Sequence, residues 1–84
     1  MKNSVVLITG GTGTFGSAFL NRCIKNKAVE IRILSRDEKK QYDMMQKYKN
    51  YSNIKFYIGD IRDKKSVDNA MHGVDYVFHA AAMK

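Results

Sequence analysis

The sequence predicts an α/β fold in which a parallel sheet carries helices on both faces. Four short runs rich in β-branched and aromatic residues, at residues 5–9, 29–34, 54–58 and 74–79, are separated by three stretches with helical spacing of apolar residues. Such regular alternation of strands and helices is typical of a doubly wound sheet. With right-handed crossovers, the four strands are expected in the spatial order 3-2-1-4.

The first strand, at residues 5–9, runs directly into three glycines spaced three apart, Gly10, Gly13 and Gly16. Gly10 is expected to turn the chain with a positive φ, which glycine adopts at little cost. Gly13 would let main-chain N–H groups approach a pyrophosphate, and Gly16 would let the next helix lie close to the strand. A glycine turn can also be purely structural, but strand, turn, helix and second strand together fill about 30 residues, the size of one βαβ unit. The segment therefore predicts a dinucleotide phosphate site at a helix N-terminus.

Capping residues define the two remaining helices. Asp37 is expected to cap a second helix that continues to about Asn50, and Asp63 is expected to cap a third helix that ends at Met71. Gly73 would supply the left-handed residue that stops the third helix. The second helix is expected to be mostly exposed, with a narrow buried stripe made of Gln41, Met44, Met45 and Tyr48.

The length of the chain limits how much of this fold it can contain. A complete dinucleotide-binding fold of this kind has about six strands, whereas the 84 residues here supply four. Residues 1–84 are therefore expected to be the N-terminal part of a Rossmann doubly wound sheet, truncated before its remaining strands. They would form one partial NAD(P)-binding domain, without the substrate-binding part, and would leave the outer edge of the fourth strand unpaired.

Composition argues against several kinds of partner and location. The net charge is +7, but acidic residues interrupt the lysines and arginines, and no basic stripe interleaved with aromatic residues is present. A solvated surface is therefore expected rather than a nucleic-acid interface. No apolar run approaches the roughly 18 to 20 residues of a membrane span, and no signal peptide precedes the first strand, so the covered region is expected to be cytoplasmic. The lone cysteine, Cys23, fits a reducing compartment.

The end of the second strand favours NADP over NAD as the dinucleotide. NAD-binding sheets place a carboxylate about 20 residues after the glycines to bind the ribose hydroxyls. Here a neutral Ser35 is followed by Arg36, whose planar guanidinium suits phosphate oxygens, and Lys39 and Lys40 add positive charge. In the alternative interpretation, Asp37 meets the ribose, Arg36 is a solvated charge, and NAD is the cofactor.

Residues after the third and fourth strands are expected to complete the cofactor site, because ligands of open α/β sheets collect at the carboxyl ends of strands. Asp60 would accept a hydrogen bond from the adenine amino group and Ile61 would pack against the ring, although a turn stabilised by Asp60 is the alternative. The small residues Ala80 and Ala81 would let a flat ring or a ribose approach the backbone. Lys84 would point toward a substrate cleft.

The sequence contains no convincing catalytic or metal-binding group. Tyr51 and Lys55 have the spacing of a Tyr-x-x-x-Lys pair, but this segment crosses from a loop into a strand, where residues four apart are not neighbours. His79 is expected to be a core or hydrogen-bonded histidine, and His72 an exposed residue at a helix end. No cluster of metal ligands is present. Catalytic residues are therefore expected beyond this chain.

With these segments placed, the chain resembles the extended short-chain dehydrogenase/reductase superfamily. The resemblance runs over all 84 residues and is carried by TGGTGTFG at 9–16, GDIRD at 59–63 and HAAA at 79–82. Within the superfamily the chain looks like the bacterial UDP-N-acetylglucosamine 4,6-dehydratases of polysaccharide and nonulosonate biosynthesis. The segments that carry this narrower likeness are SRDEKKQ at 35–41, KFYIGD at 55–60 and AAAMK at 80–84.

The resemblance implies an intramolecular redox cycle on a UDP-sugar. Hydride moves from sugar carbon 4 to NADP, water leaves across carbons 5 and 6, and hydride returns to carbon 6, giving a 4-keto-6-deoxy sugar nucleotide. Residues 12–15 would hold the pyrophosphate, 36–41 the 2′-phosphate region, and Lys84 both cofactor and substrate. The expected cofactor-binding residues are Gly10, Thr12, Gly13, Thr14, Phe15, Gly16, Ser35, Arg36, Asp37, Glu38, Lys39, Lys40, Gln41, Asp60, Ile61, Ala80, Ala81 and Lys84.

Other functions share the same cofactor half. The family's catalytic tyrosine, lysine and aspartate have no matching positions in this sequence, so the 84 residues alone are expected to be inactive. A sugar-nucleotide epimerase or reductase of the same superfamily is the alternative enzyme, because substrate choice is made mainly outside the cofactor half. A nonenzymatic NADP-sensing protein is the alternative from another class. The full-length parent is expected to be a homo-oligomer.

Overall fold

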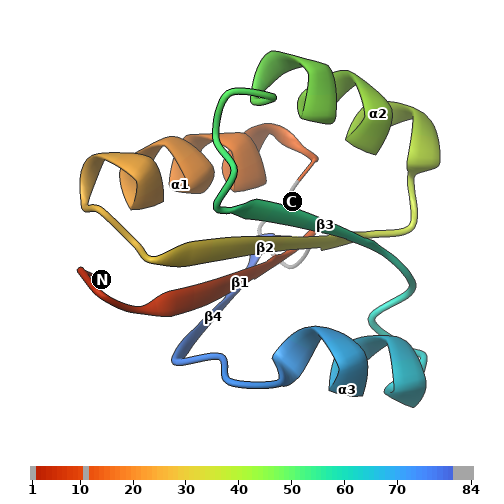
Figure 1. Cartoon of the computed structure of the whole chain (residues 1–84). Coiled ribbons are helices and arrows are strands. Elements are labelled where there is room, and N and C mark those ends of the chain that lie inside the picture. Colours follow the sequence, from red (N-terminus) through yellow and green to blue (C-terminus); the bar gives the residue numbers. More distant parts are fainter. Residues whose placement is uncertain (1, 11, 81–84) are drawn as a thin grey trace.

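The computed structural model describes residues 2–10 and 12–80, which form one parallel sheet between two helical layers (Figure 1). The strands pair in the order β3-β2-β1-β4, which confirms the predicted topology. Helices α1 and α2 cover one face and α3 covers the other (Figure 1). Within the described ranges, no helix has the length and apolarity that a membrane crossing requires. In chain order the elements are β1 (Val5–Thr9), α1 (Thr14–Lys25), β2 (Glu30–Ser35), α2 (Glu38–Lys47), β3 (Ile54–Ile58), α3 (Lys64–Met71) and β4 (Tyr76–His79).

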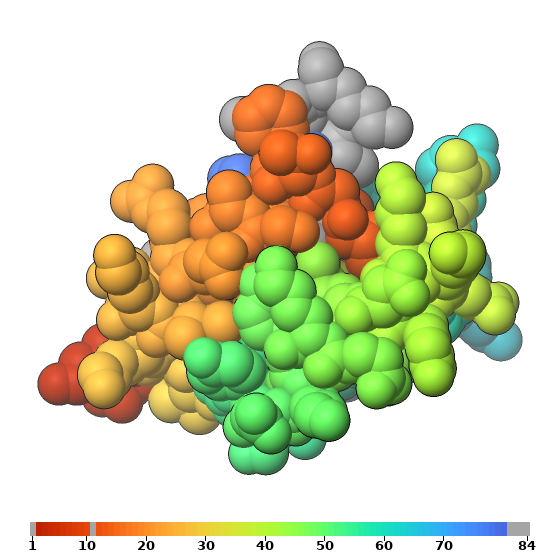
Figure 2. All heavy atoms as spheres, turned by 90° about the horizontal axis from the view of Figure 1, so that it is seen from above, coloured from red at the N-terminus to blue at the C-terminus, as the bar shows by residue number. Residues whose placement is uncertain are grey.

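The core follows the two-residue alternation of the central strands. Val6 and Ile8 of β1 belong to the larger cluster beneath α1 and α2, whereas Leu7 belongs to the smaller cluster beside α3. In Figure 2, α1 (orange) and α2 (yellow-green) lie next to each other over the larger cluster. The Tyr48 hydroxyl donates to Asn21 Oδ1 at 2.8 Å and so links these two helices. Because both faces of the sheet are covered, the central strand β1 begins with a continuous apolar run, VVLI.

Several element boundaries differ from the sequence prediction by one to three residues. The second strand begins at Glu30 rather than at residue 29, because Val29 is half exposed and donates to the Ser4 carbonyl before the ladder starts. The fourth strand begins at Tyr76 rather than at residue 74. The pairing of β4 with β1 begins only at Tyr76, because the Val5 N–H group donates to the Asp75 carboxylate at 2.8 Å.

The second helix is shorter than predicted and has a narrower buried stripe. It ends at Lys47 rather than near residue 50, and Tyr48 then forms a turn by accepting from the Tyr51 N–H group at 3.0 Å. Gln41, Met44 and Tyr48 are buried as expected, but Met45 is 45% exposed. Met45 was therefore wrongly predicted to be buried, because adjacent helical residues are about 100° apart around the axis.

Local signals for the ends of α2 and α3 are confirmed. The Asp37 carboxylate accepts from the Lys40 N–H group at 3.0 Å, and the Asp63 carboxylate accepts from the Lys65 N–H group at 3.3 Å. Both contacts satisfy helix N–H groups that lack an intrahelical partner. Gly73 follows α3 with φ +75°, the left-handed conformation expected of a C-terminal stop.

A partly buried arginine connects α3 to the sheet. Arg32 lies in β2 on the α3 side, donates to the Ala70 carbonyl at 2.8 Å and forms an ion pair with Glu30. Only 13% of its side chain is exposed. The contact satisfies a carbonyl in the last turn of α3, where helices leave acceptors without intrahelical partners. Arg32 therefore connects the last turn of α3 to β2.

Candidate functional site

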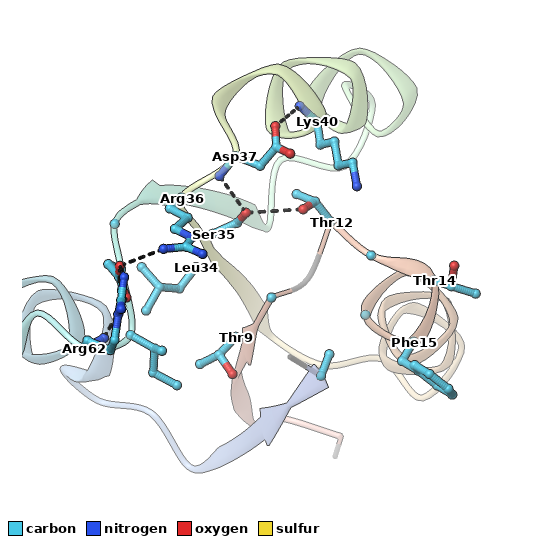
Figure 3. Close-up of a pocket in the computed structure, with 17 residues that line it drawn as sticks. Thr9, Thr12, Thr14, Phe15, Leu34, Ser35, Arg36, Asp37, Lys40 and Arg62 are labelled. Atoms are coloured by element: carbon cyan, nitrogen blue, oxygen red, sulfur yellow. Dashed lines mark hydrogen bonds and ion pairs between the residues drawn. The ribbon is translucent and has the colours of Figure 1, made fainter. Parts of the chain in front are cut away.

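One edge of the sheet is hollowed into a cavity of about 730 Å³. The turns that follow β1, β2 and β3 form its wall, so the cavity lies at the carboxyl ends of parallel strands, where ligands of open α/β sheets bind. Its volume is in the range of small-molecule and cofactor sites. The residues that line it (Figure 3) are Thr9, Gly10, Thr12, Gly13, Thr14, Phe15, Gly16, Leu34, Ser35, Arg36, Asp37, Lys40, Gly59, Asp60, Ile61, Arg62 and Ala80.

The glycine turn after β1 forms the floor of this cavity. Gly10 has φ +66°, which confirms the predicted left-handed turn, and its N–H group donates to the Leu34 carbonyl at 2.8 Å. Gly13 has φ −84°, which any residue adopts. A Cβ atom added at Gly13 would lie 3.7 Å from the Gly10 carbonyl oxygen, an ordinary contact. The backbone conformation therefore favours glycine at position 10, whereas position 13 leaves room for a Cβ atom among the described residues.

Helix α1 begins at this turn without the side-chain cap that the other two helices have. Gly13 occupies the N-cap position, where it offers no side-chain hydrogen bond, and the first turn contains no acidic residue. The first N–H groups of a helix and the positive end of its dipole favour an anion. Thr14 and the half-exposed Phe15 lie beside these groups and line the cavity. This end of α1 can therefore accept a phosphate group.

The end of β2 is tied both to the glycine turn and to α2. The Ser35 hydroxyl lies 3.2 Å from the Thr12 hydroxyl and accepts from the Asp37 N–H group at 3.1 Å (Figure 3). Gln41, predicted as a cofactor residue, is only 2% exposed, and its amide donates to the Ser35 carbonyl and to the Tyr57 carbonyl at 3.2 and 2.7 Å. Its side chain joins the ends of two strands and does not face the cavity.

The other expected cofactor residues divide into three groups. Most of them line the cavity, Lys40 included, and Figure 3 shows the Lys40 side chain reaching from α2 toward Thr12. Glu38 and Lys39 lie in the first turn of α2 but do not line the cavity. Ala81 and Lys84 lie outside the described residues, so the structure does not place them.

A carboxylate between two arginines dominates the electrostatics of one wall. Arg62 contacts Asp60 through its backbone N–H group, Nε and Nη2, with its shortest contact at 2.7 Å, whereas Arg36 reaches Asp60 with a single contact at 3.3 Å (Figure 3). The hydrogen bonds from Arg62 hold the pKa of Asp60 well below its usual range, and Asp60 in turn raises the pKa of Arg62. Asp60 is therefore ionised and largely neutralised by its neighbours.

Sequence reasoning missed four lining residues, Thr9, Leu34, Gly59 and Arg62. The first two are close to the carboxyl ends of their strands, which was a usable signal. A Cβ atom added at Gly59 would lie 2.5–2.6 Å from Ser66 side-chain atoms, so the packing of α3 requires this glycine. No local feature of the sequence marked Arg62 as a lining residue, because its ion pair with Asp60 is recognised only in the folded turn.

The residues weighed for catalysis do not assemble into a catalytic group. Tyr51 lies in a loop and Lys55 in β3, as expected. His79 is exposed rather than in the core, and its Nδ1 lies 3.0 Å from the Thr9 hydroxyl, so its hydrogen-bonded role is confirmed. Cys23 is buried in the face of α1, and burial raises the pKa of its thiol. The described part of the chain holds no group of three or more histidine, cysteine, aspartate or glutamate residues able to bind a metal.

Comparison with known proteins identifies the family. Residues 6–84 match the model of a family described as polysaccharide biosynthesis protein. The chain belongs to this family. Together with the fold, the match confirms the expected likeness to the extended short-chain dehydrogenase/reductase type. Similar curated proteins include the UDP-glucose 4-epimerases of Rickettsia typhi and Rickettsia felis, which are 58% and 59% identical over 98% of this chain and 25% of theirs. The chain thus spans about a quarter of the length of these relatives.

Solved structures show the same fold. Pen from Bacillus thuringiensis is 43% identical with a TM-score of 0.93, over 99% of this chain and 26% of that chain. The epimerase Mth375 from Methanothermobacter thermautotrophicus is 31% identical with a TM-score of 0.73, over 94% of this chain and 23% of that chain. WbmF of Bordetella bronchiseptica, solved with NAD+, is 20% identical with a TM-score of 0.72, over 93% and 23% of the two chains, and supports the fold alone.

Proposed function

We propose that this chain is the N-terminal, NADP-binding part of an enzyme that oxidises a UDP-sugar transiently at carbon 4. One observation carries the proposal: at the cavity floor, α1 begins without a side-chain cap directly behind the left-handed turn at Gly10. A dinucleotide pyrophosphate matches that arrangement, because backbone N–H groups and the helix dipole both favour negative charge there. Family membership and relatives named UDP-glucose 4-epimerase support a sugar-nucleotide substrate.

The fit of a dinucleotide rests on the space at Gly13. The protein itself would tolerate a Cβ atom at this position, so the need for glycine comes from the approach of a ligand to the backbone. In the proposed arrangement, residues 12–15 hold the pyrophosphate. Ile61 is half exposed on the far wall and packs against the adenine ring, and Asp60 accepts from the adenine amino group. Ala80 lies beside the nicotinamide ribose.

NADP rather than NAD is proposed because of the charges at the end of β2. The side chain of Arg36 is 72% exposed and lines the cavity, as does Lys40. Asp37 is the carboxylate that follows Arg36, and it is occupied as the cap of α2 through the Lys40 N–H group at 3.0 Å. A 2′-phosphate would therefore meet two cations, and the carboxylate beside them is already hydrogen-bonded to the helix.

Two reactions begin with the oxidation of carbon 4, for which bound NADP supplies the hydride acceptor. The sequence segments at 35–41, 55–60 and 80–84 favour a 4,6-dehydratase acting on UDP-N-acetylglucosamine, which we propose as the reaction. The names of the relatives, at 58–59% identity, favour a 4-epimerase as the second candidate. The residues of this chain hold the cofactor in both cases, so its site does not separate them.

The mass of the product separates the two reactions. The full-length protein should be incubated with UDP-N-acetylglucosamine and, separately, with UDP-glucose, and the products analysed by mass spectrometry. Loss of one water is expected if the protein is a dehydratase. A product of unchanged mass but altered chromatographic retention would instead support the epimerase. A protein that binds NADP yet converts neither sugar would support a sensing role, and one that binds neither NADP nor NAD would contradict the proposal.

A further inference from the structure

The wall of the cavity opposite α1 holds a cluster of three charged side chains, and the proposed function assigns no role to one of them, Arg62. Arg36 comes from the end of β2, and Asp60 and Arg62 come from the turn after β3. The side chains of Arg36 and Arg62 are mostly exposed, at 72% and 76%, whereas only 28% of the Asp60 side chain between them is exposed. All three residues line the cavity, so the cluster faces the space in which the adenosine end of a dinucleotide is expected.

The two arginines share the carboxylate unequally. Arg62 donates from Nη2 at 2.7 Å, from Nε at 3.1 and 3.2 Å to the two oxygens, and from its backbone N–H group at 2.9 Å. Arg36 donates once, from Nη1 at 3.3 Å. A guanidinium has five N–H donors, so Arg36 keeps most of its donors for another anion. The close, multiple contacts from Arg62 satisfy most of the acceptor capacity of Asp60.

We propose that Arg62 is a positioning residue for phosphate recognition: by occupying Asp60 it leaves Arg36 available to bind the 2′-phosphate of the adenosine ribose. The inference rests on the proposed NADP function and adds a specificity determinant outside the residues that contact the phosphate. Without Arg62, the Asp60 carboxylate has Arg36 as its nearest cation, and the wall loses one positive charge. Both changes disfavour a phosphate group at Arg36 while leaving a ribose hydroxyl nearly unaffected.

A proton cannot take the place of Arg62 near neutral pH. The hydrogen bonds of Arg62 keep the pKa of Asp60 low, and an aspartate without them would still be ionised at pH 7 because its ordinary pKa is about 4. Loss of Arg62 therefore leaves a full negative charge beside the phosphate site. Among residues 2–10 and 12–80, the other charged groups that line this cavity are Lys40 and the helix-capping Asp37, both from the start of α2.

The test is a double-mutant cycle measured with two cofactors. Calorimetric titration of NADP+ and NAD+ into the full-length protein is carried out on the unmodified sequence, Arg62→Ala, Asp60→Asn and the double variant. The amide oxygen introduced by Asp60→Asn would still accept from the Arg62 N–H group, so the turn is kept while the charge is removed. Arg62→Ala should weaken NADP+ binding about three- to tenfold and change NAD+ binding less than about twofold. In the Asp60→Asn background the same substitution should weaken NADP+ binding clearly less than in the unmodified sequence, because only the loss of one positive charge remains, and should leave NAD+ binding nearly unchanged.

Matched controls separate this inference from a general effect of charge or folding. Lys64→Ala removes one positive charge at the start of α3, outside the cavity lining, and should leave the ratio of NADP+ to NAD+ affinity unchanged. Equal weakening of both cofactors by Arg62→Ala, no change in either, or an undiminished loss of NADP+ affinity in the Asp60→Asn background would each overturn the inference. Arg36→Ala tells the two proposals apart: if it leaves the affinity ratio unchanged, the NADP assignment itself is wrong.

Discussion

The three strand-to-helix turns at the cavity edge differ in how their helices begin. Helices α2 and α3 start with aspartates whose carboxylates accept from their own backbone N–H groups, at 3.0 and 3.3 Å. Helix α1 starts with Gly13, which provides no side-chain cap. In a capped helix a side chain of the protein accepts hydrogen bonds from the first N–H groups. In an uncapped helix that begins at a cavity, an anion can accept them instead. The difference supports the proposal that the first turn binds the phosphates.

The largest effect on cofactor binding is expected when α1 is given the side-chain cap that the other two helices have. In Gly13→Asp the carboxylate would satisfy the first N–H groups of α1, and the described residues leave room for its Cβ atom. Its negative charge would also repel the pyrophosphate, so NADP+ and NAD+ binding should both fall by about 100-fold or more, or roughly 3 kcal/mol. Titration calorimetry measures this loss, and thermal unfolding without cofactor should show a melting temperature that is unchanged or higher. Retained binding would show that the turn does not hold the phosphates.

The second-largest expected effect is on the preference for NADP over NAD. Arg36→Ala removes the guanidinium at the end of β2 and should weaken NADP+ binding by about 1.5–3 kcal/mol, or roughly 10- to 150-fold, with little effect on NAD+. Lys39→Ala is the matched control, because it removes a positive charge in the first turn of α2 outside the cavity lining. Fluorescence titration with the reduced cofactors measures both affinities. Similar losses of NADP and NAD affinity in Arg36→Ala would identify Arg36 as a general structural residue.

A third experiment compares two glycines that line the same cavity. At Gly59 an added Cβ atom would meet Ser66 at 2.5–2.6 Å and Leu34 at 3.3 Å, whereas at Gly13 its nearest contact among the described residues is the Gly10 carbonyl oxygen at 3.7 Å. Gly59→Ala should therefore lower the free energy of unfolding by about 1–3 kcal/mol, and Gly13→Ala by less than about 0.5 kcal/mol. Urea unfolding without cofactor measures both values. Equal destabilisation by the two substitutions would contradict the assignment of Gly13 to the ligand rather than to the fold.

The smallest expected effect concerns a helix that the chain caps by itself. Asp63→Ala removes the acceptor for the Lys65 N–H group and should lower the free energy of unfolding by about 1 kcal/mol, with cofactor affinity unchanged. Asp63→Asn keeps a side-chain oxygen at the cap and should cost only a few tenths of that amount. Urea unfolding of the two variants measures the difference. An Asp63→Ala variant that loses cofactor affinity but not stability would mean that this end of α3 also belongs to the site.

The parts of the fold that were predicted from the sequence follow from the preferences of single residues or from general rules of chain topology. Gly10, Gly73 and the aspartate caps follow from conformational preferences of single residues, and strand order follows from alternation and handedness. The burial of Gln41 was predicted, but its contacts were not, because its amide donates to carbonyls at the ends of two different strands. The place of Arg62 at the cavity wall depends likewise on a partner that only the folded turn reveals.

The most direct measurement is a crystal structure of the full-length protein grown with NADP+. We predict the pyrophosphate against the backbone N–H groups at the start of α1, beside Gly13, with the 2′-phosphate at Arg36 and Arg62 still bound to Asp60. A cofactor bound at saturating concentration with its pyrophosphate away from α1, or with its 2′-phosphate in solvent, would contradict this assignment.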